Sequence, residues 1–278
     1  MHALPADGSA DDDVGMGGEV GLQFDPEISR QVDAMYMTPD VVEQRRVVRA
    51  ALALRPGDRV LDVGVGPGLL ATEMAAEVGP GGRICGIDIS DSMLAIAASR
   101  ADVPDGPGIE LELASVARIP HPAESFDVVV STQVFEYVDD VAGALAEVRR
   151  VLRPAGRVVL LDTDWGSLVW RSGDDARMAR VLTAFEDHLV DPHLPRTLAD
   201  VLVESGFTVT HRQVVPILNA GYDEGTYSAG LIDIVSGFVP GHDGLTAEDA
   251  RVWADELRGL GAGYFFSLNR YLFVASAL

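Results

Sequence analysis

Apolar residues along this chain follow two spacings, one typical of buried strands and one typical of helices. Short apolar runs bounded by turn residues predict strands at about 59–63, 83–87, 109–113, 126–131 and 156–162. Between them, helical spacing predicts helices near 68–78, 91–101 and 139–152. This alternation predicts a doubly wound parallel sheet with helices on both faces. Ligands of such sheets bind at the carboxyl ends of the strands, so functional residues are expected there.

The N-terminal part divides into an acidic tail and a helical region. Residues 1–25 are rich in Asp and Gly and predict a disordered tail, because they cannot bury a core. Residues 26–54 have helical patterning that is broken at Thr38-Pro39-Asp40. There Thr38 has the residue type of an N-cap, and Pro39 suits a first helical position. We therefore expect a cap of two helices in front of the first strand, with Tyr36 at the mouth of the site.

The C-terminal half completes the sheet and covers it. Residues 198–205 and 207–218 predict one more helix and strand, and the β-prone run 264–275 predicts the last strand. Two other segments are longer than ordinary connections, and such loops are usually functional, so we expect them to cover the substrate. The predicted organisation is a single domain, 26–278, built of a helical cap (26–54), a binding core (55–164), two insertions (165–194 and 221–263) and the rest of the core (195–220 and 264–278).

A glycine-rich turn between the first strand and the helix after it is the most specific feature. It has the form D-x-G-x-G-x-G, from Asp62 to Gly68. Its glycines allow positive φ and a close approach of a ligand. Asp88 ends the next strand, where a carboxylate can accept both hydroxyls of a ribose. In the dinucleotide fingerprint G-x-G-x-x-G, a helix N-terminus holds pyrophosphate. Asp62 would repel that group and suits an ammonium, so the pattern favours a nucleoside without a pyrophosphate.

This pattern resembles the class I S-adenosylmethionine (SAM)-dependent methyltransferases. Residues 125–131 resemble the fourth strand of that family, and residues 148–160 resemble its helix, Pro/Gly turn and fifth strand. Within the family, the chain is most similar to small-molecule methyltransferases related to the ubiquinone/menaquinone C-methyltransferases. The resemblance covers about residues 35–165 and the last strand. It implies a seven-stranded Rossmann-like sheet whose last strand is antiparallel.

The resemblance also implies a site for SAM, which leaves as S-adenosylhomocysteine. Asp62 would hold the ammonium, Asp88 the ribose hydroxyls, and Ile89 and Met93 the two faces of the adenine; a core role for Met93 is the alternative. Ser115 departs from the family, which often has an aspartate at that position. The expected cofactor-binding residues are Tyr36, Asp62, Gly64, Gly66, Gly68, Asp88, Ile89, Met93, Ser115, Val116 and Ser131.

Substrate-facing residues are expected just beyond the fourth and fifth strands. Gln133 would face the methyl group and Trp165 the substrate, and Glu136 has the place of an ordinary loop carboxylate. Asp164 and His193 are the favoured catalytic residues, since a base assists transfer to a hydroxyl or carbon acid. A loop-shaping hydrogen bond is the alternative for His193. The other candidates for a base are Asp162 and His188, and for His188 a solvated position on a helix is favoured.

Composition narrows the partners and the compartment. The formal net charge is −22, which disfavours nucleic acids and anionic membrane surfaces. The histidines are scattered and Cys85 is the only cysteine, so no metal site is predicted. Cys85 is expected to be buried in the second strand. The absence of a long apolar run, a signal peptide and a cysteine pair predicts a cytoplasmic protein, and a homo-oligomer is compatible with the sequence.

The function predicted from these features is that of an enzyme of small-molecule or secondary metabolism. It would transfer the methyl group of SAM to an oxygen, carbon or nitrogen atom of a small, hydrophobic metabolite. Two alternatives use the same cofactor residues. One is a SAM-binding enzyme of natural-product biosynthesis that catalyses a cyclisation or rearrangement, and the other is a non-catalytic SAM-binding partner of another enzyme.

Overall fold

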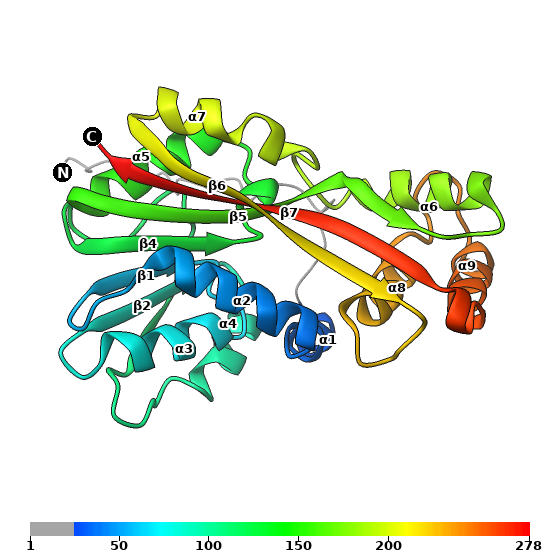
Figure 1. Ribbon diagram of the computed structural model, residues 1–278, viewed down its shortest axis with the longest axis horizontal. Helices are drawn as coiled ribbons and strands as arrows, with labels where there is room; N and C mark the ends of the chain where they lie inside the picture. The colour runs from blue at the N-terminus through cyan, green and yellow to red at the C-terminus, as the bar shows by residue number, and fades with distance from the viewer. Residues whose placement is uncertain (1–24) are drawn as a thin grey trace, which may run out of the picture.

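A single mixed sheet forms the centre of the computed structural model, which describes residues 25–278 (Figure 1). Within these residues seven strands have the order β3-β2-β1-β4-β5-β7-β6. Only β7 runs antiparallel to its neighbours, β5 and β6. This confirms the predicted Rossmann-like sheet with an antiparallel last strand. The strands are β1 (Arg59–Val63), β2 (Arg83–Asp88), β3 (Ile109–Leu113), β4 (Phe126–Thr132), β5 (Leu152–Trp170), β6 (Phe207–Ala220) and β7 (Phe265–Ala277).

Helices cover both faces of this sheet. Helices α2 (Pro39–Leu52) and α3 (Leu69–Val78) lie on one face, and α5 (Val141–Val151) and α7 (Leu198–Glu204) on the other (Figure 1). Successive strand residues point to opposite faces, so Val60 joins the core under α2 and α3 while Leu61 joins the core under α5 and α7. Both faces are buried, which explains the continuous apolar runs of the sequence. The remaining core helix is α4 (Asp91–Ala98).

The two N-terminal helices are capped differently. In α1 (Pro26–Tyr36), the Asp25 carboxylate accepts hydrogen bonds from the backbone N–H groups of Glu27 and Ile28, at 2.8 and 2.9 Å. Thr38 is the N-cap residue of α2, as predicted, but its side chain makes no capping bond. Its hydroxyl instead donates to the carbonyl of Met35 at 2.7 Å. This bond fixes the corner between α1 and α2. The predicted acidic tail lies outside the described residues, except for Asp25.

Three strands extend beyond the rest of the sheet and carry a separate helical layer. In Figure 1, β5, β6 and β7 continue past β4 toward α6 (Asp175–Glu186), α8 (Tyr227–Phe238) and α9 (Ala247–Gly259). The fifth strand was expected to end near 162, but it runs to Trp170. Pairing resumes after a bulge, with Trp170 opposite Phe266 of β7. The first part of the 165–194 segment is therefore strand.

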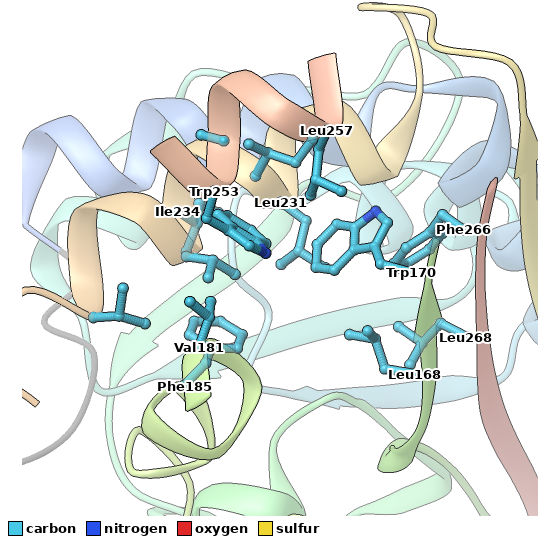
Figure 2. Close-up of a cluster of buried hydrophobic side chains, with 14 of the residues drawn as sticks. Leu168, Trp170, Val181, Phe185, Leu231, Ile234, Trp253, Leu257, Phe266 and Leu268 are labelled. Atoms are coloured by element: carbon cyan, nitrogen blue, oxygen red, sulfur yellow. The ribbon is translucent and has the colours of Figure 1, made fainter. Parts of the chain in front are cut away.

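A large apolar core holds this layer together, and part of it is drawn in Figure 2. Trp170 meets Trp253 of α9 edge-on, with ring centroids 5.3 Å apart, and Phe266 at 4.8 Å. Phe185 of α6 and Leu231 of α8 belong to the same cluster. This core fixes both insertions above the carboxyl edge of the sheet. No helix within residues 25–278 combines the length and the hydropathy needed to cross a bilayer.

Candidate functional site

The three glycines of the turn between β1 and α3 differ in what surrounds them. Gly64, Gly66 and Gly68 have φ values of +69°, +52° and +81°, which only glycine adopts without strain. A Cβ at Gly64 would overlap Val134, and one at Gly68 would lie 3.0 Å from the Cβ of Ala97. A Cβ at Gly66 would meet only the carbonyl oxygen of Gly64, at 4.0 Å. Gly64 and Gly68 therefore serve packing, whereas Gly66 faces open space that a ligand can fill.

Two carboxylates lie beside this turn. Asp88, at the end of β2, accepts hydrogen bonds from the backbone N–H groups of Gly66 at 2.8 Å and Ser90 at 2.9 Å. Burial raises its pKa. Burial and the nearby charge of Asp88 raise the pKa of Asp62, in β1, well above its ordinary value. A positively charged ligand group favours the ionised form of Asp62, and hydrogen bonds from hydroxyl groups favour that of Asp88. The chemistry of these residues therefore fits the ammonium and ribose of SAM.

The hydrophobic side chains expected around the adenine differ in their exposure to solvent. Ile89, next to Asp88, is 74% exposed and offers an apolar surface beside the turn. Met93 is buried in α4, as expected for the alternative core role. Val116 is buried in the core under α5. The contact of these three side chains with a cofactor stays a prediction.

Both predicted serines have hydrogen bonds within the protein. The Ser115 hydroxyl accepts from the backbone N–H of Ala117 at 3.2 Å. The buried Ser131 hydroxyl donates to the carbonyl of Val63 at 3.0 Å and so links β4 to β1. These bonds give each serine a structural role whether or not it also contacts a ligand.

A pocket of about 60 Å³ lies beyond the carboxyl end of β4. Its wall is built by α1, the turn η1 (Phe135–Tyr137), β5, the end of α6 and α8. The lining residues with a phenol, amide, carboxyl or imidazole group are Tyr36, Gln133, Glu136, Tyr137, His188 and Tyr227. The other lining residues are Val32, Met35, Trp165, Phe185, Leu231 and Ile234. The structure thus brings together Tyr36, which the sequence placed at the mouth of the site as a cofactor-binding residue, with Gln133 and Trp165, which it placed near the methyl group and the substrate.

Hydrogen bonds hold the predicted methyl-facing side of this pocket. The Tyr36 hydroxyl donates to Gln133 Oε1 at 3.3 Å, and Gln133 Nε2 donates to the Thr163 hydroxyl at 2.9 Å. Gln133 itself has a φ of +58°, a strained value for a residue with a side chain. Such strain persists only where surrounding structure imposes it, and here the Gln133 N–H is fixed to the carbonyl of Leu161 at 2.7 Å.

A pair of buried carboxyl groups forms the floor of the site. Glu136 was expected to be an ordinary loop carboxylate, but it is 1% exposed, because α6, α8 and β5 close over it. Its Oε2 accepts from the backbone N–H of Thr163 at 2.9 Å. Asp162 Oδ1 accepts from the backbone N–H groups of Val134, Phe135 and Glu136, at 3.2, 3.1 and 3.4 Å. The second oxygens, Glu136 Oε1 and Asp162 Oδ2, have no hydrogen-bond partner in the described part of the chain.

The electrostatics of this pair follow from its burial. Burial raises the pKa of both carboxyl groups, and the charge of Asp162 raises that of Glu136 further. Arg270 of β7 is the opposing charge. Its Nη1 donates to Gln44 Oε1, and its guanidinium lies 4.6 Å from the centre of the Tyr227 ring. Asp162 was a candidate base in the sequence. For Glu136 the only signal was a carboxylate between two aromatic residues.

Asp164 and His193 lie together, but outside the pocket lining. The Asp164 carboxylate accepts two hydrogen bonds from Arg196, both at 2.9 Å, and one from His193 Nδ1 at 3.1 Å. Burial opposes the charged form of Asp164, but these hydrogen bonds prevail and lower its pKa. The expectation of a solvated His188 is wrong: it is 3% exposed and stacks on Phe185, because it follows α6 directly under α8. Burial lowers the pKa of His188 to about 4.

Comparisons with known proteins bear on the identity of the chain. The family model described as "Methyltransferase domain" matches residues 61–160. A demethylmenaquinone methyltransferase of Symbiobacterium thermophilum is 29% identical over 227 residues, which cover 72% of this chain and 89% of that protein. A 37.1 kDa transposon protein of Streptomyces fradiae, described as uncharacterised, is 32% identical over 279 residues. The match covers 94% of this chain and 75% of that protein.

Solved structures show the same fold. A structure described as a putative methyltransferase from Bacillus halodurans has a TM-score of 0.62 at 17% identity and covers 84% of this chain and 98% of that one. Phosphoethanolamine N-methyltransferase 2 of Haemonchus contortus, solved with SAM, has a TM-score of 0.60 at 17% identity. The match covers 92% of this chain and 58% of that one. Together with the sheet order and the glycine turn, these findings show that the chain belongs to the class I SAM-dependent methyltransferases.

Proposed function

We propose that this methyltransferase acts on a small, largely apolar metabolite held in the pocket between α1, η1, β5, α6 and α8. The observation that carries the proposal is the convergence of both insertions and the first N-terminal helix, α1, on one pocket beyond β4. Its walls are mostly aromatic and aliphatic, with few polar atoms, as is typical of small-molecule sites. SAM supplies an activated methyl group, and the protein contributes position and exclusion of water.

The cofactor is proposed to bind along the edge formed by β1, β2 and β4. Asp62 would hold the ammonium and Asp88 the ribose, while Gly66 leaves room for the part of SAM that connects these two groups. Ile89, Met93, Ser115 and Val116 would surround the adenine, as the sequence predicted. Tyr36, Ser131 and Gln133 would close the methionine end below the pocket. The support for this arrangement is that Asp88 and Gly66 share a hydrogen bond, at 2.8 Å, beside open space.

Replacing Asp88 by Ala should weaken SAM binding by about 10- to 100-fold. Two ribose hydroxyls would lose their charged acceptor, and such bonds contribute roughly 1.5–3 kcal/mol. Calorimetric titration with SAM measures the effect. Asp102→Ala, an exposed aspartate after α4, is the matched control and should bind SAM normally. Unchanged affinity in a folded Asp88→Ala protein contradicts the ribose assignment.

The transfer itself is tested by incubation with methyl-labelled SAM and a metabolite extract. The expected product is about 14 Da heavier than its precursor with unlabelled SAM, since a methyl group replaces a hydrogen, and with labelled SAM it is heavier still by the mass of the label. A product of unchanged mass indicates a cyclisation or rearrangement. Tight SAM binding with no product from any extract indicates a non-catalytic partner.

Asp164 and His193 are proposed to shape the substrate side of the site. Asp164 is held by two bonds from Arg196, which leaves it a weak base. We therefore expect Asp164→Asn to lower kcat by less than about tenfold, with part of the loss in KM. A general base contributes roughly 10²–10⁴-fold. A loss of that size with unchanged KM in Asp164→Asn would restore Asp164 as the base.

A further inference from the structure

We propose that the methyl acceptor is an amine, and that Glu136 binds its ammonium form and takes up its proton. This inference rests on the proposed function, because it names the substrate class of the same pocket. Three features favour a cationic acceptor: the free carboxylate oxygen of Glu136, the aromatic lining of the pocket and the negative charge of the whole protein.

The Glu136 carboxylate is held in place but only half satisfied. Thr163 donates one backbone hydrogen bond to Oε2, at 2.9 Å, and Oε1 has no partner within the described residues. No basic side chain between residues 25 and 278 lies within 4.0 Å of this carboxylate. The indole of Trp165 is near enough to favour the charged form, although it lacks normal hydrogen-bond geometry. Arg270 lowers the pKa of Glu136 but makes no ion pair with it. A buried carboxylate without an ion pair is costly, so a cationic ligand in the pocket would complete this site.

Aromatic rings line the pocket in which such a cation would bind. Five of the residues that line the pocket are Phe, Tyr or Trp, and ring faces attract cations. His188 completes this wall without repelling a cation, because burial lowers its pKa to about 4 and keeps it neutral at physiological pH. The formal net charge of −22 also raises the local concentration of cationic over anionic substrates.

The other charged and titratable groups around Glu136 come from five elements. Burial is the largest cause that raises the pKa of Glu136, and the charge of Asp162 of β5 raises it further. The charge of Arg270 of β7 lowers it. Tyr36 of α1, Tyr137 of η1 and Tyr227 of α8 stay neutral, because burial raises the pKa of each phenol. The net result is a Glu136 pKa above its ordinary 4.5, which makes it a better proton acceptor than an exposed carboxylate.

The step balances without any further reactant. One N–H proton of the ammonium passes to Glu136 Oε1, which leaves a neutral amine with a free electron pair. That pair forms the new N–C bond while the C–S bond breaks, and the electrons of the C–S bond stay on sulfur. The products are a methylated ammonium, S-adenosylhomocysteine and a protonated Glu136, which returns its proton to water after the product leaves.

The first test compares acceptors that share one apolar body and differ only in an amino, hydroxyl or activated CH group. Methyl-labelled SAM reports transfer. We expect the amine to be methylated and Glu136→Gln to lower kcat/KM for it by about 10²–10⁴-fold, the usual contribution of a general base. SAM affinity should remain within about twofold, since Glu136 is not assigned to the cofactor. Glu124→Gln makes the same change at an exposed glutamate and should leave the rate unchanged.

The second test measures binding without reaction. In the presence of S-adenosylhomocysteine no transfer occurs, so calorimetry with the amine and the matching alcohol reports recognition alone. We expect wild-type protein to bind the amine about tenfold more tightly than the alcohol, an effect in the range of a desolvated cation–π contact or charged hydrogen bond. Glu136→Gln should abolish this preference. If that variant fails to fold, Glu136→Asp retains the charge and should keep part of the preference.

The pH profile separates a base from a merely structural carboxylate. In wild-type protein, kcat/KM for the amine should fall as pH drops through the raised pKa of the carboxyl pair. This limb should be missing in Glu136→Gln. Methylation of the alcohol or carbon acid, with no effect of Glu136→Gln, overturns the amine proposal but leaves the proposed function intact. SAM binding without methylation of any acceptor overturns both.

Discussion

Gly66→Val should abolish SAM binding, with a loss of affinity on the order of 100-fold or more, while the sheet remains folded. Gly66 has a φ of +52°, and its missing side chain faces open space. The left-handed conformation costs an L-residue roughly 1–2 kcal/mol, and a β-branched residue adopts it least readily. The larger effect is steric, because the new side chain takes the space beside Asp88 that the cofactor is proposed to fill. Calorimetric titration with SAM measures the loss.

Gly79→Val is the matched control for this prediction. Gly79 ends α3, has a φ of +65° and also has no atom within 4 Å of its missing Cβ. The same substitution there also places a β-branched residue at positive φ, with a ψ of −179° that is essentially confined to glycine. It should therefore lower stability but leave SAM binding normal. Equal SAM affinity in Gly66→Val and wild type would show that the turn serves folding alone.

The parts of the fold that the sequence predicted are those set by neighbouring residues. Strand β1, the glycine turn and α3 are consecutive, so their apolar spacing and the three glycines specify them locally. Asp88 was found for the same reason, because it is the acid at the end of the next strand. The difference between Gly64 and Gly68, where a side chain would meet other residues, and Gly66, which faces open space, was not predictable. It depends on Val134 and Ala97, which reach the turn from distant elements.

The side of the site that we propose for the substrate was less predictable, because distant segments build it. Glu136 follows β4 in a short turn and has the sequence of a solvated carboxylate. It is buried only because β5, α6 and α8 meet above it. The extension of β5 to Trp170 depends on pairing with β7, almost a hundred residues later. For Asp164, residue type and position indicated a base, but its ion pair with Arg196 appears only in three dimensions.

Trp253→Ala should cause a loss of about 3–5 kcal/mol in the free energy of unfolding, the usual range for removing a large buried aromatic side chain. Trp253 is fully buried in α9 and meets Trp170 of β5 edge-on at 5.3 Å. Its Nε1 also contacts Met178 Sδ of α6 at 3.4 Å. Figure 2 shows its ring among Leu231, Ile234 and Leu257. Denaturant titration with matched baselines measures the change.

The consequence for function follows from where this cluster lies. Trp253 joins α9 to β5 and α6, and the same cluster includes Leu231 and Ile234 of α8, which line the pocket. Gly66 and Asp88 lie in the turns of the sheet core instead. At a temperature where Trp253→Ala is still folded, we therefore expect near-normal SAM affinity and a marked loss of methyl transfer. Arg251→Ala, on the exposed side of α9, should stay within about 0.5 kcal/mol of wild type. Unchanged transfer in a destabilised Trp253→Ala protein would show that the pocket is shaped without this core.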